Sequence, residues 1–263
     1  MKNKWVVITG GAGYLSYYIS KDLLINNYKL ILWDKNFKKL KFQKNKLLSE
    51  LNINKSLIKI KKINITSKLL VQKEINRLDK LKYSIYALLN CASNNPTPNE
   101  KNIKFGSKKF LNQWEQDIKI GLTGAAICSY IISNYFLKTN KNGRVINFSS
   151  DLGIIAPNQN IYKYNGYIKP LSYSVVKHGI IGITKYFSTL YGNTNIRYNT
   201  ICYGPIISKK MDKKLIKEIS KLIPINRLGK VNEISSPILF LLDKKNSFMN
   251  GHSLIIDGGR TIW

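Results

Sequence analysis

A tyrosine and a lysine that could share one proton-transfer site lie four residues apart in the stretch LSYSVVKHGIIG. They are Tyr173 and Lys177. If this stretch is helical, both side chains lie on one face, about one turn apart. A free phenol has a pKa of roughly 10, and a nearby fixed positive charge lowers that pKa by favouring the phenolate. The pair therefore has the chemistry of a general acid/base. In a chain with 16 Tyr the spacing also arises by chance, so the other motifs must support it.

A second candidate site lies near the N-terminus, where the glycine-rich run TGGAGYLS follows an apolar stretch at residues 9–16. A turn of this kind between a strand and a helix lets a pyrophosphate approach backbone N–H groups at the helix N-terminus. Asp34 ends the next apolar run. A carboxylate there accepts hydrogen bonds from an adenosine ribose and repels a 2′-phosphate, which favours NAD over NADP. Lys35, Lys38 and Lys39 lie close by and would weaken this preference. The alternative role for Asp34 is to start the following helix.

The elements that must position these residues alternate between strands and helices. We expect strands at 4–9, 28–33, 57–65, 84–90, 143–148, 196–202 and 253–256. We expect helices at 14–26, 37–51, 67–81, 110–138, 173–191 and 231–242, with Ser67 as an N-cap. The intervening segments 94–104, 152–170 and 204–230 are loops, the last with a short internal helix. The alternation predicts an α/β fold, a Rossmann-type doubly wound parallel sheet of about seven strands. The chain has no internal repeat or linker, so we expect a single domain over residues 1–263.

Composition narrows the class of protein. The chain has 263 residues, 44% of them hydrophobic, which is enough for a sizeable core. Cys91, Cys128 and Cys202 are scattered and have neither metal-ligand nor disulfide-framework spacing, which predicts no metal site and a reducing, cytoplasmic location. The first apolar run is too short for a signal peptide, and no apolar run approaches the length of a membrane span.

The formal net charge of +29 has two interpretations. One is a protein that binds nucleic acid or a membrane surface. The other is a coding bias toward Lys, Asn and Ile. The lysines are spread through helices and loops, and no zinc-finger or RNP-like motif accompanies them, so we favour the second. We expect no specific nucleic-acid partner and only weak, salt-dependent, non-specific binding. The positive field would still attract an acidic substrate.

From residue 4 to the C-terminus the chain resembles the short-chain dehydrogenase/reductases. TGGAGYLS is similar to the family's glycine motif, with Ser16 at its last glycine. NCAS at 90–93 resembles the Asn-Asn-Ala-Gly motif after the fourth strand, and GRVINFSS resembles the fifth strand. RYNTICYG resembles the sixth strand, with Gly204 retained and Tyr203 in place of the usual Pro. The stretch from 226 to 259 is similar to the family's C-terminal region.

The resemblance implies roles for individual residues. Ser150 matches the catalytic serine and would hydrogen-bond the substrate oxygen. Tyr173 would exchange the proton, while Lys177 would lower the tyrosine pKa and hold the nicotinamide ribose. The alternatives are a strand-end cap for Ser150 and a solvated helix residue for Lys177. The implied cofactor-binding residues, besides Tyr173 and Lys177, are Thr9, Gly10, Gly13, Tyr14, Leu15, Asp34, Asn64, Ile65, Asn90, Cys91, Ala92, Gly204 and Ile206. Asn64 stands where the family usually has an Asp near the adenine.

Two departures from the family pattern are informative. Gly121, in IKIGLTGA, stands where the family often has an Asn that ties the catalytic lysine to a water relay, so the relay must use backbone, water or another residue. Tyr173 follows Ser150 by 23 positions, longer than the common form. This segment, the Gly-Leu-Thr-Gly variant and the terminal Trp263 resemble a subgroup of bacterial surface-glycan and flagellin-modification proteins. That likeness implies a sugar or nucleotide-sugar substrate, with Asn158, Gln159 and Asn160 among the loop residues available to bind it.

The favoured function is an NAD(P)-dependent oxidoreductase that transfers hydride between nicotinamide and an alcohol or ketone, with NAD preferred. One alternative is a 3-oxoacyl-thioester (acyl-carrier-protein) reductase, which Asp34 disfavours because such reductases usually take NADPH. Another is a dinucleotide-binding sensor without catalysis, which intact Ser150, Tyr173 and Lys177 disfavour. The family likeness also implies a homotetramer or homodimer, built through the helices at 110–138 and 173–191 and the C-terminal region.

Overall fold

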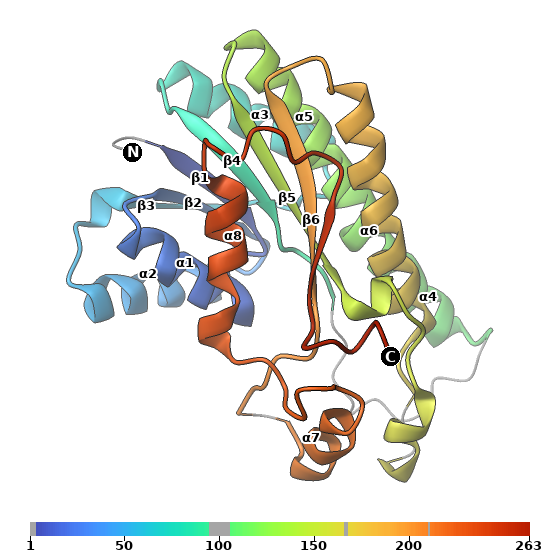
Figure 1. The fold of residues 1–263 in the computed structure, drawn as a ribbon. Coiled ribbons are helices and arrows are strands. Elements are labelled where there is room, and N and C mark those ends of the chain that lie inside the picture. The colour runs from blue at the N-terminus through green and yellow to red at the C-terminus, as the bar shows by residue number, and fades with distance from the viewer. Residues whose placement is uncertain (1–3, 95–105, 166–167, 210) are drawn as a thin grey trace.

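The computed structural model describes residues 4–94, 106–165, 168–209 and 211–263. A seven-stranded parallel sheet in the order β3-β2-β1-β4-β5-β6-β7 runs through this part of the chain (Figure 1). Its strands are β1 (Trp5–Thr9), β2 (Lys29–Asp34), β3 (Ile58–Lys62), β4 (Ile85–Asn90), β5 (Gly143–Ser150), β6 (Ile196–Tyr203) and β7 (Ser253–Ile256). The doubly wound parallel sheet predicted from the alternation of patterns is confirmed.

Helices cover both faces of the sheet (Figure 1). One face carries α1 (Tyr14–Ile25), α2 (Phe37–Leu51) and α8 (Ser235–Leu242), and the other carries α3 (Lys68–Lys80), α5 (Gly124–Lys138) and α6 (Leu171–Leu190). α4 (Lys108–Ile118) packs against α6. The short helix α7 (Lys213–Ser220) contacts the 3₁₀ segment η4 (Gln159–Asn165) beyond the carboxyl ends of the strands.

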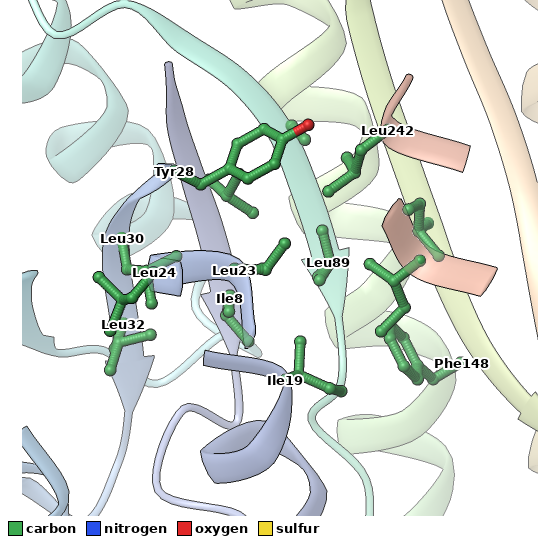
Figure 2. Packing of buried hydrophobic residues seen from close by; sticks show 14 of the residues in the cluster. Ile8, Ile19, Leu23, Leu24, Tyr28, Leu30, Leu32, Leu89, Phe148 and Leu242 are labelled. Atoms are coloured by element: carbon green, nitrogen blue, oxygen red, sulfur yellow. The ribbon is translucent and has the colours of Figure 1, made fainter. Parts of the chain in front are cut away.

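The sheet separates two apolar cores because alternate residues of each strand face opposite sides. In β1, Val6 and Ile8 belong to one core, while Trp5 and Val7 belong to the other. Figure 2 shows the first core, where Ile8 and Leu89 of the sheet lie against residues of α1 and α8. Strands buried on both faces read as continuous apolar runs rather than alternating ones, which is why these strands could be recognised in the sequence.

The helix expected over 110–138 is interrupted. α4 leads into a five-residue π-helical segment, η2 (Lys119–Thr123), and α5 follows directly. Gly121 lies in the middle of η2, and a Cβ atom there would lie 2.4 Å from Cγ1 of Val176 on α6. The absent side chain thus lets α6 approach this widened turn closely. Isolated π-helical turns within α-helices are frequently found at functional sites.

By length and composition alone, the combined helix Lys108–Lys138 could cross a membrane, although 56% of its most apolar window is buried in the fold. The sequence analysis expected no apolar run near the length of a membrane span, and this helix is an exception by length and composition. A core helix packed against a sheet meets the same criterion, so this helix is weak evidence for a membrane span.

Most other boundaries agree with the expectation to within two or three residues. Ser67 accepts a hydrogen bond from Leu70 N at 3.4 Å, so the predicted N-cap is confirmed. The expected helix at 231–242 is split into the 3₁₀ turn η5 (Val231–Glu233) and α8. The loop expected at 94–104 lies almost entirely outside the described residues.

Candidate active site

The ends of β1, β4, β5 and β6 bring polar side chains to one edge of the sheet. Thr9, Asn90, Ser150 and Tyr203 are the last residues of β1, β4, β5 and β6. The carboxyl ends of parallel strands meet at the same edge, and in doubly wound sheets ligands bind in the crevice where the strand order reverses, here between β1 and β4. The Thr9 hydroxyl accepts a hydrogen bond from Ala92 N at 3.2 Å, which joins the segments that follow these two strands.

A cavity of about 390 Å³ lies at this crevice. Five of the predicted cofactor-binding residues line it, namely Gly10, Asp34, Asn64, Ile65 and Ala92. It is also lined by Lys35 and Ser93, which the sequence analysis placed near the cofactor, and by residues that it missed, namely Trp33, Ile63, Thr66, Asn94, Gln116, Lys119 and Ile120. Gln116 lies on α4, and Lys119 and Ile120 lie on η2. In the sequence these positions showed only helical periodicity. The volume is in the range of small-molecule sites.

The glycine turn and Asp34 form one hydrogen-bonded unit. Gly10 has φ +65°, and a Cβ there would lie 2.8 Å from Ala92 Cα, so this position requires glycine. Asp34 Oδ2 accepts Ala12 N at 3.0 Å, and Oδ1 accepts Asn36 N at 2.8 Å. Because Asn36 caps α2, the alternative role of Asp34 as the start of that helix is wrong. The carboxylate is fixed beside the turn, at the edge of the cavity.

The N-terminus of α1 suits a phosphate group. Its N-cap is Gly13, which makes no side-chain cap hydrogen bond. The backbone N–H groups of the first turn therefore have no side-chain acceptor, and the helix dipole favours an anion there. Tyr14, predicted to bind cofactor, donates its hydroxyl to Ile207 O at 3.3 Å, and Leu15 packs against the core. The turn, the carboxylate and the cavity together fit an adenine dinucleotide.

The loop after β6 lies beside the glycine turn without lining the cavity. Gly204 N donates to Ile256 O at 2.9 Å, and a Cβ on this glycine would lie 2.8 Å from Asp257 Cα. Ile206 forms an isolated parallel bridge with Gly229. Both predicted cofactor residues are fixed by contacts of the backbone, and neither lines the cavity.

Asn90 is buried at the end of β4, and Cys91 after it is half-buried. Asn90 Nδ2 donates to Asn147 Oδ1 at 2.8 Å, and Asn147 Nδ2 donates to Thr184 Oγ1 at 2.8 Å. This buried network ties β4 and β5 to α6, and sequence reasoning missed it because its members lie far apart in the chain. Burial raises the pKa of the Cys91 thiol, which keeps it protonated and unreactive.

Lys177 is a buried residue of α6, so the alternative of a solvated helix residue is wrong. Its ammonium donates to Phe148 O at 3.0 Å and lies 5.5 Å from the ring centre of Tyr173. Ser149 Oγ donates to Lys177 O at 2.7 Å, which fixes α6 against the end of β5. A Cβ on Gly153 would lie 2.7 Å from the same carbonyl, so this packing requires the glycine.

Ser150 lies at the end of β5 beside an unexpected carboxylate. Its hydroxyl donates to Asp151 Oδ1 at 2.5 Å and accepts Leu152 N at 3.2 Å, so the strand-end cap proposed as its alternative role is present as well. Asp151 Oδ2 forms a buried ion pair with Arg260 from the C-terminal segment. Sequence reasoning missed this pair, although a carboxylate directly after the serine was a visible signal.

Burial dominates the proton affinities of the pair on α6. It raises the pKa of Tyr173 to about 12, and a hydrogen bond with Ser150 acts in the opposite direction. Burial also lowers the pKa of Lys177 to about 8. The net lowering of the tyrosine pKa that was expected from the lysine is therefore wrong for the protein alone, because desolvation of the phenolate is the largest effect. Tyr173 is a protonated acid at neutral pH.

A buried carboxylate near η2 also joins α6 to the crevice. Asp117 Oδ2 accepts the Ser172 hydroxyl at 2.5 Å, and Oδ1 accepts Asn94 Nδ2 at 2.8 Å and Gln113 Nε2 at 2.7 Å. Gly121, at the position of the family's relay Asn, has no room for a side chain beside Val176. No group of three or more His, Cys, Asp or Glu in the described ranges could hold a metal ion.

Comparisons with known proteins give a consistent picture. A family model described as "Enoyl-(Acyl carrier protein) reductase" matches residues 15–261. The post-translational flagellin modification protein A of Campylobacter coli is 26% identical over 98% of both chains. A 3-oxoacyl-[acyl-carrier-protein] reductase of Thermotoga maritima is 31% identical over 57% of both chains. The 2-dehydro-3-deoxy-D-gluconate 5-dehydrogenase of Bacillus subtilis is 27% identical over 56% of this chain. These last two matches span 57% and 55% of those proteins.

Solved structures share the fold. A short-chain dehydrogenase from Leptospira borgpetersenii with bound NAD⁺ has a TM-score of 0.82 at 23% identity, covering 100% of this chain and 94% of that one. ElxO with bound NADP has the same TM-score and identity and covers 99% of both chains.

Proposed function

Because the chain belongs to the short-chain dehydrogenase/reductase family of NAD(P)-dependent oxidoreductases, we propose that it transfers a hydride between nicotinamide and the alcohol or ketone group of a sugar or nucleotide-sugar. The observation that carries this proposal is the grouping of Ser150, Tyr173 and Lys177. Ser150 lies at the end of β5, and Tyr173 and Lys177 lie on successive turns of α6, at the carboxyl edge of the sheet. A sensor without catalysis would have no need of this grouping.

Each side chain has a distinct role in the proposed reaction. The bound nicotinamide supplies or accepts the hydride. In the reducing direction Tyr173, which is protonated at neutral pH, donates a proton to the substrate oxygen. Ser150 would hold that oxygen once its hydroxyl proton turns away from Asp151, to which it is donated in the structure, while the serine oxygen accepts Leu152 N. Lys177, tied to Phe148 O, holds the nicotinamide ribose and favours the phenolate once the proton has left.

The cofactor we propose is NAD, with NADP less favoured. Asp34 supports this choice because its carboxylate would accept a ribose hydroxyl and would repel a 2′-phosphate. Lys35 lines the same cavity and would act in the opposite direction. For the cofactor we further propose contacts with the cavity-lining Asn64 and Ile65, the glycine turn and the segment after β4.

The substrate class rests on two relatives. One relative, which matches this chain over 98% of both chains, is named as a flagellin modification protein. Another is named as a dehydrogenase of a sugar acid. We propose in addition a single domain, a cytoplasmic location and a homodimer or homotetramer, with no specific nucleic-acid partner and no membrane association. A 3-oxoacyl-thioester reductase is the second candidate, favoured by the 31% identity to such an enzyme.

The first test replaces Tyr173 with Phe in the whole protein. We expect turnover to fall by about 10² to 10⁴, with NADH binding almost unchanged, because only the hydroxyl is lost. Tyr186→Phe on the same helix is the matched control, since Tyr186 is 64% exposed. Wild-type turnover by Tyr173→Phe would rule out the mechanism.

The second test compares the dissociation constants of NADH and NADPH for the wild type and Asp34→Ala. Tighter NADH binding that is lost or reversed in the variant supports the role of Asp34, and Asp22→Ala on α1 controls for the change in charge. Tighter NADPH binding by the wild type would favour the acyl-thioester reductase. Binding of neither cofactor would refute the proposed function.

A further inference from the structure

A polar side chain of α2 is buried against the glycine turn. Gln43 is 6% exposed and lies between Leu40 and Leu47 on the buried face of that helix. Its amide nitrogen Nε2 donates to Gly11 O at 2.8 Å and to Gly13 O at 3.4 Å. We propose that Gln43 is a positioning residue that orients the glycine turn for the diphosphate of the cofactor. This inference rests on the proposed function, because it needs a dinucleotide at the turn.

The contact requires the amide donor of this side chain. Two carbonyl oxygens can be paired only by the NH₂ end of a glutamine, because its oxygen end would repel them. α2 lies next to α1 on the same face of the sheet (Figure 1), and position 43 belongs by its spacing to the apolar stripe of α2. A polar residue buried in such a stripe needs a hydrogen-bond partner, and Gln43 finds two in the backbone of the turn.

The peptide group between Gly11 and Ala12 is held at both ends. Its oxygen accepts the Gln43 amide, and its N–H group donates to Asp34 Oδ2 at 3.0 Å. A trans peptide directs its oxygen and its N–H group to opposite sides, and the described residues contain no cis peptide bond. The two contacts therefore fix the plane of this peptide group. They also connect α2 to the carboxylate that is proposed to bind the adenosine ribose.

The contact with Gly13 O acts on the N-terminus of α1. By the same peptide geometry, the N–H group of Tyr14 points away from the oxygen that α2 holds. The N–H groups before it are already used within the protein. Gly11 N donates to Trp33 O at 2.9 Å. Gly13 N donates to Gly10 O at 2.8 Å. The first N–H groups of α1 are thus the ones available to an anion.

Fixing the turn before the ligand arrives strengthens binding, because the ligand then does not have to order the turn. It also keeps the two carbonyl oxygens directed at α2, whereas an oxygen that rotated toward a bound diphosphate would repel it. A glutamine that only filled the space between α1 and α2 would have no specific effect on the diphosphate. The two roles therefore differ in how the protein responds to ligands with and without that group.

The test compares two ligands that differ by the diphosphate. The full chain is titrated calorimetrically with ADP and with adenosine, and urea unfolding of each variant is measured in parallel. Gln43→Met keeps most of the volume of the side chain and removes the donor, whereas Gln43→Glu keeps its shape and replaces the donor with an oxygen. Gln72→Met on α3 is the matched control, because the Gln72 amide donates to Asn76 on its own helix.

We expect Gln43→Met to bind ADP about tenfold more weakly than the wild type, and Gln43→Glu more weakly still, with adenosine affinity changed by less than about twofold. Gln72→Met should bind both ligands as the wild type does. Unchanged ADP affinity in Gln43→Met would overturn the inference, and so would an equal loss for adenosine, since the effect would then not be specific to the diphosphate. A wild type that binds neither ligand would refute the proposed function together with this inference.

A second measurement uses the wild type alone and does not depend on the folding of any variant. Amide hydrogen exchange by NMR should show the N–H groups of Gly11, Ala12 and Gly13 protected without ligand, and ADP should leave that protection unchanged. A turn that becomes protected only when ADP binds would overturn the inference, because it would not be oriented in advance.

Discussion

The buried ion pair between Asp151 and Arg260 offers a quantitative test of how the C-terminal segment supports the end of β5, where the proposed catalytic residue Ser150 lies. The two side chains are 3% and 5% exposed, and the pair joins positions 109 residues apart in the chain. Arg260→Met leaves a buried carboxylate that still accepts hydrogen bonds from Ser150 and Leu152 N. Breaking a buried pair by removing one partner costs about 3–5 kcal/mol. Because two hydrogen bonds to Asp151 remain, we expect the lower end, about 3 kcal/mol.

The free energy of unfolding is measured by urea denaturation at pH 7 and fixed protein concentration for the wild type, Arg260→Met, Asp151→Asn and the double variant. At about 2–4 °C per kcal/mol for a chain of this size, Arg260→Met should lower Tm by about 6–12 °C. The double variant should lose less than the sum of the single losses, since neither charge is then left unpaired. Arg227→Met is the control, because its partner Glu233 lies on the surface and such pairs contribute little.

Two outcomes would refute this reasoning. A loss in Arg260→Met no larger than in Arg227→Met would mean that the buried pair does not hold the C-terminal segment. Strictly additive losses in the double variant would mean that the two charges do not interact. Arg260→Met and Asp151→Asn should also lose turnover at unchanged NADH affinity, because Asp151 positions the Ser150 hydroxyl and does not line the cofactor cavity.

Three further predictions follow from contacts around α6. Gly121→Asn should destabilise the protein by about 1–3 kcal/mol in urea unfolding, because the Cβ atom of the new side chain would overlap Val176. Adding Val176→Ala should recover most of that loss. Full stability of the single variant would contradict the packing. Gly153→Ala should lower Tm and turnover together, since its Cβ would push against Lys177 O, whereas Gly182→Ala, which has open space, should not. NADH affinity, measured by fluorescence titration, should fall as the pH rises through about 8, where Lys177 loses its proton. Lys177→Met should bind NADH weakly at every pH. An NADH affinity of Lys177→Met that still depends on pH would assign the titration to another group.

The sequence determined the features that depend on neighbouring residues. Buried parallel strands are continuous apolar runs, and the amphipathic helices between them have their own period, so the order of elements could be read directly. Tyr173 and Lys177 share a face because one helix carries both. Asp34 lies at the end of its strand, a position that the local sequence alone determines. The glycine turn is equally local, since its conformation depends on the missing side chain of Gly10.

Only the tertiary structure decided which distant residues meet these groups, because such contacts depend on how α6, the C-terminal segment and the sheet edge pack together. No periodicity connects Asp151 to Arg260, or Asn90 to Asn147 and Thr184. The direction of the Tyr173 pKa shift also required the fold, since it follows from burial of the phenol rather than from the lysine one turn away. Gln43 belongs to this group as well, because its contact with Gly11 O depends on how α2 packs against α1.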